Sequence, residues 1–169
     1  MGLLLGILLL SSFAADSKES SGNPAIQWDT YQSQAMAFSI QNPHDWKVRE
    51  SGGYGKSVIF SHHISSHQSV FAWVELVEMD YLMGVLSGEP GLQKLFQPGY
   101  HKNTRHLDGV LVTQVEGESR DTPKGRLRMI FASRNGRNFK LSLGVPDKAL
   151  WKEYQPIFET MLSSFKFSR

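Results

Sequence analysis

The chain has 169 residues, a length typical of one domain of ordinary size. Its hydrophobic fraction of 40%, charged fraction of 20% and formal net charge of +2 at pH 7 are those of a globular protein, and they exclude an intrinsically disordered one. The sequence contains no cysteine, which excludes a disulfide framework, a thiolate nucleophile and any metal site built on cysteine.

Residues 1–14 predict a secretory signal peptide. The apolar run Leu3–Leu10 is too short to span a bilayer, and Ser12 and Ala14 are small residues where a signal peptidase would cleave. The alternative is an uncleaved anchor or a misread start. The polar, Ser-rich residues 15–24 predict a flexible linker, so residues 25–169 form the single domain.

The first half of this domain predicts strands followed by two short helices. Alternating apolar residues indicate strands over residues 35–42, 45–50 and 56–62, with a Gly-rich turn at residues 51–55. The almost continuously apolar residues 69–78 indicate a strand covered on both faces. Asp80 is the expected N-cap of the first helix, Gly88 its stop signal, and Pro90 belongs to the first turn of the second.

The second half predicts a four-stranded meander and a final helix. The meander strands are expected at residues 100–107, 110–118, 126–134 and 137–145, and Asp108-Gly109 and Asn135-Gly136 are two-residue hairpin signals. Asp147 should cap the last helix, and Pro156 should kink or split it. A short strand closes the chain. This order predicts an α+β fold with one mainly antiparallel β-sheet flanked by helices.

Two motifs carry a resemblance to a known family. FSIQNPHDWKV, residues 38–48, joins two strands through Pro-x-x-Trp, and WKEYQPIFETMLSSFKF, residues 151–167, combines a helix with a terminal strand. With the meander between them, they resemble the PsbP-like family over about residues 35–167. The resemblance implies an α/β/α sandwich and a non-enzymatic accessory or binding role, as in photosystem II PsbP and the Ran-binding Mog proteins. It implies no site residue, because no residue set here matches the positions those proteins use.

Three histidines, His62, His63 and His67, are the candidate metal ligands. His62 and His63 are adjacent and point to opposite faces of an extended chain, whereas His63 and His67 converge only if the chain turns between them. A tight site usually needs three or four ligands, so a polar loop between strands is the competing interpretation. A metal- or small-ligand-binding periplasmic protein is therefore the first alternative function, and no other cofactor is predicted.

Glu116 and Glu118 share one face of a predicted strand, as a catalytic pair of carboxylates would. A regular hairpin places Glu118 opposite Arg126 and Glu116 opposite Arg128, which favours cross-strand ion pairs on the surface. No nucleophile motif is present. A hydrolase with dispersed catalytic residues is the second alternative function.

Residues 120–140 are the strongest charge feature. They contain seven basic residues and one acid, Asp121, so the segment carries +6 while the rest of the chain carries −4. This asymmetry favours a protein partner or an anionic partner of the cell envelope. Nucleic acid is not expected, because the chain is exported and the segment has no interleaved aromatics. The candidate partner-binding residues are Arg120, Lys124, Arg126, Arg128, Arg134, Arg137 and Lys140.

The sequence as a whole predicts a non-catalytic, exported accessory or binding protein that acts through its surface. Export without disulfides suits a bacterial periplasm, although secretion or an organellar lumen is also compatible. After cleavage of the signal peptide no transmembrane segment is expected.

Overall fold

The computed structural model describes residues 25–51, 56–122 and 124–168. The predicted signal peptide and linker, and residues 52–55 of the predicted Gly-rich turn, lie outside these ranges. Within them, no helix is long and apolar enough to cross a membrane.

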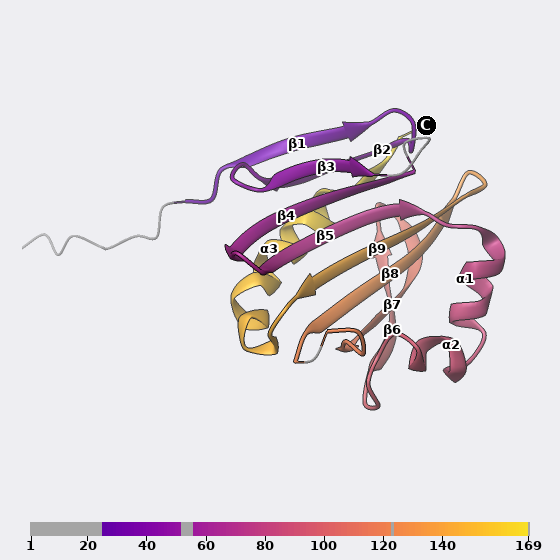
Figure 1. The fold of residues 1–169 in the computed structure, drawn as a ribbon. Coiled ribbons are helices and arrows are strands. Elements are labelled where there is room, and N and C mark those ends of the chain that lie inside the picture. Colours follow the sequence, from indigo (N-terminus) through magenta and orange to yellow (C-terminus); the bar gives the residue numbers. More distant parts are fainter. Residues whose placement is uncertain (1–24, 52–55, 123, 169) are drawn as a thin grey trace, which may run out of the picture.

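The described residues form antiparallel sheets and three α-helices, which confirms the α+β prediction, although the strands form two sheets and not the expected one (Figure 1). The larger sheet has the strand order β3-β4-β5-β9-β8-β7-β6, and the smaller has the order β1-β2-β10. The smaller sheet consists of β1 (Trp28–Ser33), β2 (Phe38–Pro43) and β10 (Lys166–Phe167). The larger consists of β3 (Lys47–Ser51), β4 (Ser57–Ser65), β5 (Gln68–Leu76), β6 (His101–Leu107), β7 (Val110–Glu118), β8 (Arg126–Arg134) and β9 (Arg137–Val145).

One face of the seven-stranded sheet, here called the closed face, carries the main core. Helix α3 (Trp151–Ser164) packs there, behind the sheet in Figure 1, together with the smaller sheet. Aromatic rings dominate the contact, and those of Phe38 in β2 and Phe165 stack 5.2 Å apart. Because each strand alternates its side chains, Ile130 and Ala132 of β8 also point to this core.

The opposite face, here called the open face, carries Phe71, Trp73, Met129 and Lys140. Two short helices, α1 (Met79–Leu86) and α2 (Glu89–Gln93), cover only part of it. A second, smaller core forms beneath them, and its buried residues are Leu82, Val85, Leu92, Phe96, Val115, Leu127, Met129 and Phe131. The fold therefore leaves one part of the sheet without a covering helix.

Both predicted hairpin turns are confirmed. Asp108 and Gly109 have φ of 47° and 76°, and Asn135 and Gly136 have φ of 52° and 73°. Positive φ at both central residues is the type I′ geometry, whose twist matches that of the flanking strands. The register across β7 and β8 is also confirmed, since Glu118 lies opposite Arg126 and Glu116 opposite Arg128.

Three local expectations are wrong. Asp80 does not cap α1, because the helix begins at Met79 and its N-cap residue, Glu78, makes no side-chain capping bond. The expected split at Pro156 is absent, because α3 continues unbroken to Ser164, and the alternative of a kink stays a prediction. Strand β5 is not covered on both faces: alternate residues from Val70 to Val74 are buried, but Phe71 and Trp73 are only half-buried. The cause is that the core beneath α1 and α2 is built mainly on β7 and β8.

Candidate functional site: a groove on the open face

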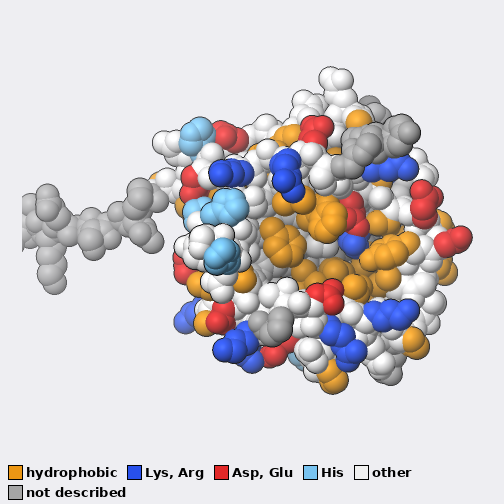
Figure 2. All heavy atoms as spheres, viewed as in Figure 1, with side chains coloured by type: hydrophobic (Ala, Val, Ile, Leu, Met, Phe, Trp, Pro, Cys, Tyr) orange, Lys and Arg blue, Asp and Glu red, His pale blue; other side chains and the backbone are white. Residues whose placement is uncertain are grey.

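The uncovered part of the open face is a groove of about 250 Å³. Phe71 and Trp73 of β5, Leu127 and Met129 of β8, and Leu95 after α2 supply its apolar lining. Figure 2 shows hydrophobic side chains gathered in the middle of this face, with charged side chains among and around them. A concave surface that is mainly apolar with a few polar groups is the usual form of a binding site.

A glycine in β9 allows one wall of the groove to form. A Cβ atom at Gly144 would lie 2.5 Å from Cζ of Phe71, so the Phe71 ring occupies the space that any other side chain would need. The two residues are direct cross-strand neighbours. The absence of a side chain at Gly144 thus lets the ring lie close against the sheet.

Lys140 is the charged residue within the groove lining that lies deepest. Its neighbours across the strands are Glu75 of β5 and Phe131 of β8. The Lys140 ammonium forms an ion pair with Glu75 and donates a hydrogen bond of 3.2 Å to the hydroxyl of Tyr81. It also lies 5.5 Å from the centre of the Trp73 ring. The ion pair and the cation–π contact together offset the free-energy cost of burying the lysine ammonium.

The indole nitrogen of Trp73, Nε1, is buried without a hydrogen-bond partner. Among the described residues, it is the one buried side-chain nitrogen or oxygen atom that lacks a partner. A buried donor without an acceptor costs about 1–3 kcal/mol. The groove therefore contains one polar group whose hydrogen-bonding capacity is unused.

Helix α1, whose Tyr81 contacts Lys140 of the groove, carries further exposed apolar side chains. Met79, Tyr81 and Met83 are exposed on it, Met83 to 56%. A neighbouring hollow of about 270 Å³ between α1 and α2 shares Leu95 with the groove. Exposed apolar side chains near a groove often mark a contact surface, and methionines adapt to different partners. We call the groove and these α1 residues together the open-face surface.

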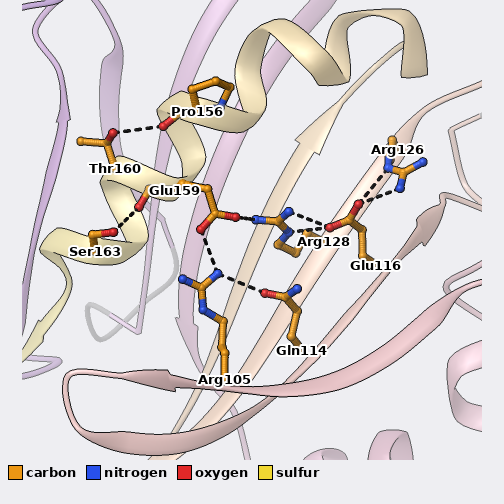
Figure 3. Close-up of polar contacts among 9 residues, drawn as sticks. All are labelled: Arg105, Gln114, Glu116, Arg126, Arg128, Pro156, Glu159, Thr160 and Ser163. Atoms are coloured by element: carbon orange, nitrogen blue, oxygen red, sulfur yellow. Dashed lines mark hydrogen bonds and ion pairs between the residues drawn. The ribbon is translucent and has the colours of Figure 1, made fainter.

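Of the two ion pairs predicted for the hairpin surface, Glu116–Arg128 forms but is buried against α3 (Figure 3), whereas Glu118 pairs with Lys148 and not with Arg126. Arg128 is only 3% exposed, and it donates to Glu116 at 2.7 Å and to Glu159 of α3. Arg126 donates to the same Glu116, also at 2.7 Å. Both guanidinium groups lie over the Trp151 ring, at 5.3 and 5.2 Å from its centre. The surface-pairing interpretation is wrong because α3 crosses this part of the closed face.

Glu159 joins this network to the edge strand. Arg105 of β6 donates to Glu159 at 3.0 Å and to Gln114 of β7 at 3.3 Å. Burial alone would raise the pKa of Glu159, but the hydrogen bonds and charges of Arg105 and Arg128 outweigh it and hold that pKa below its usual value. Three guanidinium groups share two carboxylates in this network, and each charge contacts an opposite one, so the network is a connection between helix and sheet.

The seven basic candidates do not form one surface. Arg128 lies on the closed face and Lys140 on the open face, where it is paired with Glu75; Arg126, the first residue of β8, pairs with Glu116 and also reaches the groove lining. Arg120 and Lys124 lie in the β7–β8 connection, and Arg134 and Arg137 flank the turn at the other end of β8. The charge excess of the segment is thus divided between two faces and two ends. Partner binding by the individual residues stays a prediction.

The three histidines lie at the far end of the β4–β5 hairpin. His62 and His63 belong to β4 and not to a loop, and His67 lies in the turn. His62 stacks on Trp46 at 6.3 Å, and its Nδ1 is 3.5 Å from Asp45.

His63 makes a separate contact, since its Nδ1 is 2.8 Å from the Ser69 hydroxyl. In the parts of the chain that the structure describes, no group of three or more His, Cys, Asp or Glu could hold a metal ion. The metal site stays a prediction.

The structure offers no assembled triad for a hydrolase within the described ranges. His63 contacts a serine without a carboxylate on its other side, and His44 contacts Asp29 at 2.9 Å without a hydroxyl nucleophile. Both contacts are on the surface, and the groove lining contains no histidine. Nothing in this geometry therefore favours catalysis.

Comparison with known proteins places the fold. No family model and no curated protein matches the sequence. The structure is similar to cyanobacterial PsbP (CyanoP) from Synechocystis sp. PCC 6803, with a TM-score of 0.55 and 15% identity over 90% of this chain and 98% of the other.

Two further solved structures are similar at the same level. The Ran-binding protein Mog1p of Saccharomyces cerevisiae gives a TM-score of 0.54 and 9% identity over 85% of this chain and 96% of the other. LpqN of Mycobacterium tuberculosis, which is involved in cell envelope biogenesis, gives a TM-score of 0.53 and 14% identity over 86% of this chain and 92% of the other. The chain thus has the PsbP-like fold that its two motifs predicted.

Sequence reasoning missed the groove. Its one usable signal was Glu75, an acid inside an otherwise apolar strand, because a buried carboxylate requires a buried cation nearby. Lys140 was considered only as part of a basic segment. Its actual surroundings depend on the pairing of β5 with β9, which are more than 60 residues apart in the chain.

Proposed function

We propose that this chain is a non-catalytic, exported binding protein of the cell envelope, and that it holds a protein partner on its open-face surface. The observation that carries the proposal is the incomplete cover of the sheet. Phe71 and Trp73 line a groove that no element of the described chain fills, and the neighbouring helix α1 carries exposed methionines. Burial of such an apolar surface by a partner would be energetically favourable.

The compartment and the kind of activity have separate support. The predicted signal peptide and the lack of cysteine support export to a periplasm. The likeness to a Ran-binding protein and to a protein of envelope biogenesis supports partner binding, at the level that a shared fold allows. The paired state of the buried charges supports a role without catalysis, because no strongly reactive group is left in the groove.

Site-specific photo-crosslinking tests this proposal. A photoreactive amino acid is placed at Met83 on α1 in one variant and at Leu111, in β7 beside the β6–β7 turn, in the other. The two side chains are 56% and 63% exposed, so they are matched in accessibility. After expression and export, the Met83 variant should yield a discrete crosslinked product that the Leu111 variant lacks. Equal crosslinking from both positions, or none from Met83, would contradict the proposal.

A further inference from the structure

Building on the proposed function, we propose that the groove accepts a neutral, apolar segment of the partner protein. The segment would insert an aliphatic or aromatic side chain together with a backbone carbonyl oxygen. A carboxylate would be rejected. This assigns a chemical class to the occupant of the open-face surface, and three features of the groove lead to it.

The first feature is charge. Of the two cations that line the groove, Lys140 is paired with Glu75, and Arg126 is paired with Glu116, which it shares with Arg128. The remaining charged residue of the lining is Asp121, a further carboxylate. An incoming anion would meet only cations that already have a carboxylate partner and would also lose its hydration, so binding would be unfavourable. The electrostatic complement of this groove is a neutral group.

The second feature is size. At about 250 Å³ the groove is smaller than the roughly 300–1,000 Å³ typical of sites for drug-sized ligands. It suits one or two inserted side chains. The exposed residues Met79, Tyr81 and Met83 of α1 offer further apolar surface that a small molecule in the groove would not cover. A protein segment that inserts one anchor side chain and rests on the methionines uses the whole surface.

The third feature is the unused donor. Nε1 of Trp73 is buried without an acceptor, in a ring whose centre lies 5.5 Å from the ammonium of Lys140. A backbone carbonyl is the acceptor that every neutral peptide carries, so a bound segment can satisfy this N–H. The Trp73 ring is half-buried and lines the groove, and the proposal requires it to turn so that its N–H reaches the ligand. Hydrogen bonding would then offset a cost that the free protein bears.

Nuclear magnetic resonance with blocked amino acids tests this chemistry in the 15N-labelled mature protein. The chain has four tryptophans and therefore four indole N–H signals, and Trp73→Phe identifies the one that matters. Three probes are compared: N-acetyl-leucine methylamide, N-acetylglycine methylamide, which lacks the apolar side chain, and N-acetyl-leucine, which ends in a carboxylate.

The leucine methylamide should shift the Trp73 indole signal downfield in a saturable manner. It should bind at least about fivefold more tightly than either other probe, a difference of about 1 kcal/mol. Thr122→Trp, which places a large ring at the groove rim, should weaken this binding, and Thr104→Trp on the exposed edge strand β6 should not.

Equal or tighter binding of the carboxylate probe, or a Trp73 signal that none of the probes moves, would overturn the inference. The crosslinking experiment at Met83 distinguishes a failure of this inference about the groove from a failure of the proposed function. If crosslinking succeeds but the Trp73 signal does not respond, a partner uses the open-face surface without entering the groove. If crosslinking at Met83 fails as well, the proposed function itself is wrong.

Discussion

Arg128 in β8 and Glu159 in α3 form an ion pair across the closed face, and the guanidinium group of this pair is almost entirely buried. Arg128 also holds Glu116, so one side chain connects the C-terminal helix to the meander (Figure 3). Because this link is buried and shared, its removal should be costly in a way that an exposed pair is not.

Arg128→Met should therefore lower the free energy of unfolding by about 3 kcal/mol, since two carboxylates lose a buried partner. Glu159→Gln should cost less, about 1 kcal/mol, because Glu159 is partly exposed and Arg128 keeps Glu116. Urea denaturation measures both. The control is Glu118→Gln, which breaks an exposed pair with Lys148 and should cost under about 0.5 kcal/mol. An Arg128→Met loss no larger than that of the control would contradict this account.

The free energy of unfolding should fall on acidification, in part because two carboxyl groups, those of Asp108 and Glu159, become protonated. Burial raises the pKa of Asp108 and of Glu159, but hydrogen bonds to the Phe167 amide and Lys166, and to Arg105 and Arg128, lower it further than burial raises it. Groups with a lowered pKa in the folded state stabilise the protein above their ordinary pKa values of 3.8 and 4.5. That contribution is lost as the pH falls through the folded pKa.

The wild type should consequently lose more unfolding free energy between pH 6 and about pH 3 than the double variant Asp108→Asn/Glu159→Gln. Urea midpoints at each pH provide the comparison. The two proteins would lose equal stability if these carboxyl groups were not held by their partners, and that result would contradict the assignment.

Tyr31 should be among the last tyrosines to ionise. Burial, and then the hydrogen bond of 2.7 Å that it donates to Glu50, raise its pKa to about 12. The neutral phenol contributes its stability below pH 10, and the contribution is lost as the pH rises through the folded pKa. Ultraviolet titration of the five tyrosines should show this late step, and Glu50→Gln should move it to lower pH. Tyr31→Phe identifies the signal, and a late step that survives this substitution would disprove the assignment.

Two glycines should respond to alanine in opposite directions. Gly136 has φ of 73° in the β8–β9 turn, where an L side chain is strained, so Gly136→Ala should cost about 1–2 kcal/mol. Gly84 lies inside α1, and a Cβ there would meet no atom within 4 Å. Gly84→Ala should therefore stabilise the protein by about 0.5–1 kcal/mol. Thermal unfolding tests both, and changes of the same sign would contradict the backbone geometry described here.

The parts of this fold that sequence predicts well are those fixed by neighbouring residues. Asp108-Gly109 and Asn135-Gly136 determine their turns locally, and the turns in turn fix the register that sets Glu116 opposite Arg128. The burial of Arg128 could not be predicted in the same way. It depends on where α3 crosses the sheet, and the residues of α3 are about 30 positions further along the chain.

The candidate site was even harder to predict from the sequence. A continuous apolar strand at residues 69–78 was expected to have cover on both faces, and this pattern alone does not distinguish a covering helix from an empty groove. The groove arises because α1 and α2 are short and lie over the small core built on β7 and β8. The length and position of covering helices are properties of the whole fold, which explains why Trp73 and Lys140 were not recognised as neighbours.

The central claim is that the open-face groove receives the partner, and its most direct test is to block the groove while the reporter at Met83 stays in place. The photo-crosslinking experiment is repeated in a Thr122→Trp background and in a Thr104→Trp background, which carries the same substitution on exposed β6. We expect the Met83 crosslink to decrease strongly with Thr122→Trp and to be unchanged with Thr104→Trp. A crosslink of undiminished yield in the Thr122→Trp protein would contradict the claim that the groove is where the partner binds.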